Sequence, residues 1–133
     1  NKLIIKPDGT RKKVIFYNTS LQAVLECDKN YIRKLKDVLS FFYDNQEKVT
    51  LLWRPHPLME TTIASMKPHL LEAYNRIVKD YKQQAYGIYD DSSDLYRAIA
   101  ISDAYYGDYS SVAILYKMTG KPIMTQKVEV MKR

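Results

Sequence analysis

Short runs of apolar residues recur along the chain, and each is rich in β-branched or aromatic side chains. Such runs are typical of strands that are buried on both faces of a parallel sheet. Polar residues, glycine or proline follow them and mark the points where regular pairing ends. The strands predicted on this basis cover residues 13–17, 49–53, 87–89, 104–106 and 121–125.

Longer segments between these runs carry apolar residues at three- and four-residue steps, which is the pattern of an amphipathic helix. Two predicted helices extend from Tyr31 to Phe42 and onward from Pro68, and shorter ones cover residues 95–101 and 112–118. Strands and helices therefore alternate with short connections. This order predicts an α/β fold, an open parallel sheet with helices on both faces.

The length of 133 residues fits one domain that buries its own core. A short extended piece and a turn precede the first predicted strand. Residues 1–12 are therefore interpreted as a linker or N-terminal extension, and residues 13–133 as the domain. Because the first residue is Asn1 rather than Met, we expect a piece of a longer protein.

The net charge of +6 suits three classes of partner: nucleic acid, an anionic membrane surface or phosphorylated substrates. The basic residues are mostly scattered, and no basic motif with interleaved aromatic residues is present, so nucleic acid is not predicted as a partner. Cys27 is the single cysteine, which excludes a disulfide within the chain and favours an intracellular setting.

Three polar runs follow predicted strands, at residues 18–20, 54–57 and 107–111. Parallel strands end at the same edge of a sheet, and open α/β sheets bind ligands outside the carboxyl ends of their strands. The three runs, although far apart in the sequence, are therefore expected to meet at one rim. This rim is the candidate site.

The run at residues 107–111 reads Gly-Asp-Tyr-Ser-Ser and joins a strand to a helix. Gly107 permits backbone geometry that a side chain would hinder, and Ser110 or Asp108 is expected to cap the helix. Backbone N–H groups of the first turn and the hydroxyls of Ser110 and Ser111 would then favour an anion such as phosphate. The alternative is an ordinary helix cap without a ligand.

The run at residues 54–57 reads Arg-Pro-His-Pro, so two prolines restrict the backbone around His56. The guanidinium of Arg54 can form a fork to phosphate oxygens. His56 can donate to a phosphate or transfer a proton near neutral pH. The alternative is a structural loop whose histidine bonds a neighbouring carbonyl.

Neither a metal nor a cofactor is predicted. Asp90, Asp91 and Asp94 are close in sequence, but a capping turn explains them more simply, and no histidine or cysteine stands at ligand spacing. The chain contains neither Gly-x-x-x-x-Gly-Lys nor Gly-x-Gly-x-x-Gly. This argues against a P-loop NTPase and a dinucleotide-dependent oxidoreductase.

Taken together, these motifs resemble a known family. Residues 101–113 contain Ser-Asp followed by Asp-Tyr-Ser-Ser, and residues 120–123 contain Lys-Pro. This order is similar to the C-terminal domain of the CDP-glycerol glycerophosphotransferase family, the teichoic-acid polymerases and primases. That family also carries an Arg-x-His-Pro run after an earlier strand, which residues 54–57 match. The resemblance covers roughly residues 13–125.

The resemblance implies one half of a GT-B enzyme, in which two Rossmann-like domains face each other and the C-terminal one holds the nucleotide donor. The family moves glycerol phosphate from CDP-glycerol to a hydroxyl of a cell-surface polymer, without an obligate protein-bound metal. The resemblance also implies that His56 lies near the pyrophosphate of the donor and assists departure of the nucleotide. Ser110 and Ser111 would contact the donor phosphates, with Asp108 beside them.

The implied partners are CDP-glycerol or another nucleotide-diphosphate donor, a polymer acceptor and an N-terminal GT-B domain. The implied location is cytoplasmic and peripheral, at the inner face of a bacterial cell membrane, where the basic charge would meet anionic lipid. The family's second catalytic histidine belongs to a "WHG" run that this chain does not contain. We therefore expect the isolated domain to be inactive.

The loop after the first strand usually reads "PT-x-R" in the family, whereas this chain reads Tyr17-Asn18-Thr19-Ser20, and only Thr19 corresponds. Thr19 is therefore a further candidate for donor binding. Two alternatives stay open. One is a UDP-sugar-dependent GT-B glycosyltransferase or sugar-nucleotide epimerase for capsule or surface polysaccharide. The other is a non-enzymatic α/β regulatory module, supported by the acidic pair Asp90-Asp91 alone.

Overall fold

The computed structural model describes residue 6 and residues 8–27, 29–92, 94–108 and 110–126. Residues 3–5, which form the short extended piece predicted before the first strand, lie outside these residues. The elements in chain order are β1 (Lys13–Thr19), α1 (Leu21–Cys27), α2 (Lys29–Asp44), β2 (Val49–Pro55), α3 (Met59–Met66), the 3₁₀ helix η1 (Pro68–Leu70), α4 (Leu71–Gln84), β3 (Ile88–Tyr89), α5 (Leu95–Ile101), β4 (Ala104–Asp108), α6 (Ser111–Lys117) and β5 (Ile123–Gln126).

The strands form one parallel sheet in the order β3-β2-β1-β4-β5. The chain winds outward from β1 through β2 to β3, then returns past β1 to β4 and continues to β5. The winding direction reverses between β1 and β4, and open parallel sheets bind ligands beside such a reversal. The predicted Rossmann-like α/β fold is confirmed, and the reversal lies between β1 and β4.

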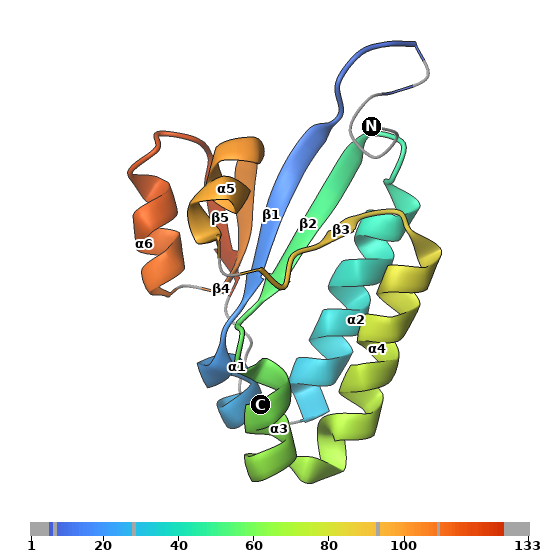
Figure 1. Ribbon diagram of the computed structural model, residues 1–133, viewed down its shortest axis with the longest axis vertical. Helices are drawn as coiled ribbons and strands as arrows, with labels where there is room; N and C mark the ends of the chain where they lie inside the picture. The colour runs from blue at the N-terminus through green and yellow to red at the C-terminus, as the bar shows by residue number, and fades with distance from the viewer. Residues whose placement is uncertain (1–5, 7, 28, 93, 109, 127–133) are drawn as a thin grey trace.

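Helices cover both faces of the sheet, with α2 and α4 on one side and α5 and α6 on the other (Figure 1). Successive strand residues point to opposite faces. Tyr17, Leu51 and Trp53 therefore belong to the core beneath α2 and α4, whereas Phe16 and Leu52 belong to the core beneath α5 and α6. The strands β1 to β4 each contribute to both cores, which explains why their predicted segments are apolar at nearly every position.

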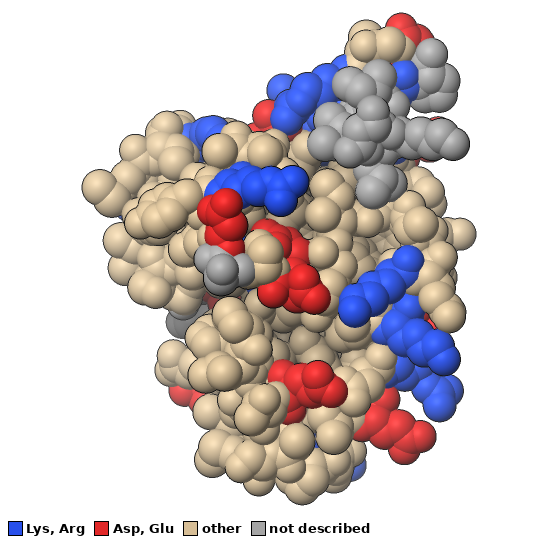
Figure 2. Space-filling model, viewed as in Figure 1, with Lys and Arg blue, Asp and Glu red and all other residues tan. Residues whose placement is uncertain are grey.

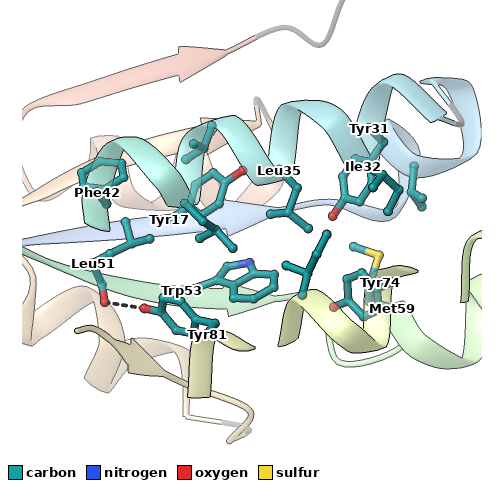
Figure 3. Packing of buried hydrophobic residues seen from close by; sticks show 14 of the residues in the cluster. Tyr17, Tyr31, Ile32, Leu35, Phe42, Leu51, Trp53, Met59, Tyr74 and Tyr81 are labelled. Atoms are coloured by element: carbon teal, nitrogen blue, oxygen red, sulfur yellow. Dashed lines mark hydrogen bonds between the residues drawn. The ribbon is translucent and has the colours of Figure 1, made fainter. Parts of the chain in front are cut away.

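Tyrosines make up much of the larger core. The ring of Trp53 makes edge-on contacts with Tyr74 and Tyr81, with centroids 6.4 and 5.3 Å apart (Figure 3). The Tyr81 hydroxyl donates to the carbonyl of Leu51 or of Ile88, at 2.8 and 2.9 Å. Tyr81 thus fills space with its ring and connects β2 to β3 with its polar tip.

The sequence-based prediction omits two helices and shortens three strands. The helix α1 is short, and α3 buries only Met59 and Ile63, so neither presents a long apolar stripe. The strands β1, β2 and β4 each continue two residues beyond the predicted apolar run. They continue because Asn18 pairs in register with Arg54 on one side and Gly107 on the other. These polar residues belong to the sheet rather than to loops.

One apolar hollow of about 710 Å³ lies between α2 and the sheet, and its lining includes Phe41, Phe42, Tyr106 and Met124. The side chains of Phe41 and Met124 are 60% and 65% exposed. The hollow follows the middle and the amino-terminal part of the strands. None of the predicted site residues lines it.

The face shown in Figure 2 mixes charges of both signs. Lysine and arginine gather over α4, whereas aspartate and glutamate lie near the connection between β3 and α5. The net charge of +6 therefore does not form a single basic field on this face. Among the helices that the structure describes, none has the length and apolar character required to cross a bilayer.

Candidate functional site

The ends of β2, β1 and β4 lie side by side, and their register aligns the polar residues. Asn18 is opposite Arg54 on β2 and opposite Gly107 on β4. Thr19 is opposite Pro55, and the backbone N–H of His56 donates to the Thr19 carbonyl at 3.2 Å. The prediction that the three runs share one rim therefore agrees with the sheet register.

Gly107 allows β4 to approach β1 closely. Its φ of +150° lies in a region that favours glycine. A Cβ atom at this position would lie 2.9 Å from the backbone nitrogen of Asn18 and closer still to its carbonyl oxygen. Because both contacts are to backbone, neither can move aside. Glycine is therefore required for the close pairing of the two strands at the reversal point.

A hydrogen-bonded cluster joins the end of β1 to the end of β4. The Nδ2 of the buried Asn18 lies 3.1 Å from the Tyr105 hydroxyl and 3.2 Å from the Oγ of Ser110. The Tyr105 hydroxyl donates to the Asp108 carbonyl. The Asp108 carboxylate accepts the backbone N–H of Ser20 at 2.7 Å. These bonds fix the two strand ends relative to each other.

The expectation of a serine or aspartate side-chain cap on α6 needs correction. Ser110 occupies the N-cap position, but its side chain makes no capping hydrogen bond. Its Oγ is instead the acceptor for Asn18, and the carboxylate of Asp108 accepts from Ser20. Ser110 is half-buried and Ser111 is exposed, whereas Tyr109 lies outside the described residues. Both serine hydroxyls lie at the start of α6, beside the rim.

Arg54 is buried and directed toward β3. Its Nη2 donates to the Ser92 carbonyl at 2.8 Å, and its Nε lies 3.5 Å from the Oδ2 of Asp90. The second contact is an ion pair without hydrogen-bond geometry, since Nε has no hydrogen-bond partner among the described residues. Arg54 therefore holds the segment after β3 against the end of β2. Its predicted contact with phosphate stays a prediction.

His56 is exposed at the rim. Its Nδ1 accepts the backbone N–H of Leu58 at 3.0 Å. A neutral imidazole that accepts at Nδ1 carries its proton on Nε2. The adjacent hollow of about 250 Å³ is lined by His56, Glu60, Lys82 and Asp91, among others. The ring can therefore donate an Nε2–H to a ligand at the ends of β2 and β3.

Thr19 faces the core rather than the rim. Its side chain is 1% exposed, and its Oγ1 accepts the indole N–H of Trp53 at 3.4 Å. Strand alternation explains this placement, because Thr19 shares a face with Tyr17 and Asn18 points to the opposite face. Direct contact of the Thr19 side chain with a nucleotide donor stays a prediction. The neighbouring Asn18, which does face the cluster, was not predicted as a site residue.

Burial is the main cause of the raised pKa values of two tyrosines on β4. It raises the pKa of Tyr105 to about 12, although hydrogen bonds from Asn18 and Ser110 act in the opposite direction. Burial also raises the pKa of Tyr106, with the Asp108 carboxylate as a further cause. Both phenols are therefore neutral at physiological pH, and the Tyr105 hydroxyl keeps the hydrogen that it donates.

Comparison with known proteins identifies a family for the chain. A family model described as CDP-Glycerol:Poly(glycerophosphate) glycerophosphotransferase matches residues 11–132, which include all the predicted site residues. No curated protein matches the chain significantly.

Proposed function

The chain belongs to the CDP-glycerol:poly(glycerophosphate) glycerophosphotransferase family, and on that premise we propose that it is the donor-binding half of a GT-B transferase. The donor is CDP-glycerol, and the acceptor is a hydroxyl of a cell-surface polymer of the teichoic-acid type. The observation that carries the proposal is the cluster of Asn18, Asp108 and Ser110 at the reversal point of the sheet, beside the exposed His56.

The transfer exchanges one P–O bond for another. The oxygen of the acceptor hydroxyl forms a bond to the phosphorus that carries glycerol. The bond from that phosphorus to the bridging oxygen breaks, and CMP departs with the bonding electron pair. The proton of the acceptor hydroxyl passes to a base on the acceptor-side domain. Charge builds up on the leaving phosphate, so donors directed at its oxygens accelerate the reaction.

His56 is suited to that role because its Nδ1 is already occupied by the Leu58 N–H. The Nε2–H then donates to an oxygen of the departing phosphate. The hydroxyls of Ser110 and Ser111 donate hydrogen bonds to phosphate oxygens of CDP-glycerol. Arg54 acts indirectly. Its ion pair with Asp90 and its hydrogen bond to the Ser92 carbonyl hold the segment after β3 in place. Thr19 supports the end of β1 through Trp53.

A ligand titration followed by NMR tests this proposal. CDP-glycerol and CDP are expected to shift the signals of His56, Ser110 and Ser111, whereas UDP compounds bind more weakly. Ser111→Ala is expected to weaken CDP binding, and Ser40→Ala, an exposed serine on α2, is the matched control. Absence of binding at about 1 mM donor would contradict the proposal. Preference for uridine would favour a UDP-sugar-dependent enzyme.

The location at a membrane surface is a separate part of the proposal. Lipid-linked polymers are made at the cytoplasmic face, and a net charge of +6 favours anionic lipid. Flotation with vesicles is expected to recover the protein with anionic lipid and to lose it as salt rises. Equal recovery with neutral vesicles would contradict an electrostatic contact.

A further inference from the structure

The hydrogen directions in the Asn18 cluster follow from its chemistry. The Tyr105 hydroxyl has one hydrogen, and it is directed at the carbonyl of Asp108, a group that only accepts. The Tyr105 oxygen must therefore be an acceptor toward Asn18, 3.1 Å away. This fixes the orientation of the Asn18 amide, with its NH₂ group toward Tyr105.

The second hydrogen of the same NH₂ group reaches the Oγ of Ser110 at 3.2 Å. Ser110 is thus an acceptor in this bond, and its own hydroxyl hydrogen is not used there. That hydrogen can be directed to the Tyr105 oxygen within the cluster or to a ligand oxygen at the rim. Ser110 is half-buried and lies two residues after the end of β4, at the rim.

We infer that Asn18 is a positioning residue that keeps the Ser110 hydroxyl a hydrogen-bond donor toward the phosphate of a nucleoside diphosphate. Ionised phosphate oxygens only accept hydrogen bonds. If the group at position 18 accepted the Ser110 hydrogen, the serine would present only lone pairs to the anion. The buried amide excludes that arrangement. This inference rests on the proposed function, and it adds a residue that acts through Ser110 without contact to the ligand.

A double-mutant cycle tests the inference in the 133-residue chain. The variants are Asn18→Ala, Ser110→Ala and the double substitution, each measured for binding of CDP and of cytidine by calorimetry. Each single substitution is expected to weaken CDP binding about tenfold. The double substitution is expected to weaken it no further, because Asn18 acts through Ser110. Cytidine, which has no phosphate, is expected to bind all variants equally.

Asn18→Asp provides a second arm, which decides the question if Asn18→Ala does not fold. A carboxylate of nearly the same shape accepts the Ser110 hydrogen and turns it away from the ligand. CDP binding is expected to fall by more than tenfold, and to recover as the new carboxyl group protonates at lower pH. Gln83→Glu, which makes the same amide-to-carboxylate change on the exposed surface of α4, is expected to leave CDP binding unchanged.

Three results separate the two hypotheses. If the folded wild-type chain binds no nucleoside diphosphate, the proposed function fails and this inference with it. If the wild-type chain binds CDP but the single losses multiply to about 100-fold in the double variant, only the role of Asn18 is overturned. The same holds if Asn18→Asp binds CDP as tightly as Gln83→Glu.

Discussion

Two regions of the rim hold their residues in different ways. The β4-end region (residues 107–111) is bonded inward to β1, through Gly107, the Asn18 cluster and the contact of Asp108 with Ser20. In the β2-end region (residues 54–57), the backbone is bonded to β1, but the Arg54 side chain bonds outward to the segment after β3 and the His56 side chain is exposed. The first region thus has a fixed geometry, and the second presents one exposed imidazole. Substitution of Gly107 should therefore affect folding, whereas substitution of His56 should leave folding unchanged.

The largest expected effect is that of Gly107→Ala. The added Cβ would meet the backbone of Asn18, and φ is unfavourable for alanine. We expect a loss of about 3 kcal/mol or more in the free energy of unfolding, measured in urea. Gly120→Ala is the matched control, because Gly120 also has positive φ but open space around it, and it should lose about 1 kcal/mol. Equal losses would contradict close packing at the reversal point.

His56→Asn is expected to reduce transfer from CDP-glycerol about 100-fold in the two-domain transferase proposed above. Asparagine can still accept the Leu58 N–H but cannot donate from the Nε2 position. The free energy of unfolding should change by less than about 0.5 kcal/mol, since the side chain is exposed. His69→Asn, on η1, is the control. If His56→Asn lost as much free energy of unfolding as Gly107→Ala, the contrast between the two regions would disappear.

Arg54→Met is expected to lower the free energy of unfolding by about 2 kcal/mol. Methionine retains much of the volume, but it leaves the Ser92 carbonyl without its donor and Asp90 without its cation. CDP binding should weaken mainly because the segment after β3 is no longer held in place. Arg76→Met is a suitable control, because Arg76 is exposed and its ion pair with Glu72 is 3.9 Å long. If Arg54→Met binds CDP normally but has a lower free energy of unfolding, the role of Arg54 is structural alone.

The smallest expected effect is that of Tyr105→Phe, about 1 kcal/mol at neutral pH from the lost hydrogen bonds. The wild-type pKa of about 12 lies above the ordinary value of 10.0. A raised pKa means that the stabilisation is complete below about pH 10 and is lost as pH rises through 12. Urea titrations at rising pH should therefore show the Tyr105→Phe variant losing less stability than the wild type. Parallel curves would contradict the burial of this phenol.

Sequence reasoning recovered the layers of the fold because alternating strands and helices leave few arrangements. It could not place the strand ends, because polar residues such as Asn18 and Arg54 continue the pairing beyond the apolar run. It identified Ser110 but assigned it a capping role, since only the folded chain shows that Asn18 reaches its Oγ. The alternation along β1 was a usable signal that Thr19 and Asn18 point to opposite faces.

The apolar hollow beside α2 has a practical consequence for assays of folding. Its walls are apolar, its volume is about 710 Å³, and Phe41 and Met124 remain accessible. Dyes such as anilinonaphthalene sulfonate fluoresce on surfaces of this kind, and their fluorescence usually signals a partly folded state. The native chain should bind such a dye by itself. Stability measurements on the variants above therefore require circular dichroism or NMR as the reporter, with dye binding reserved for mapping this face.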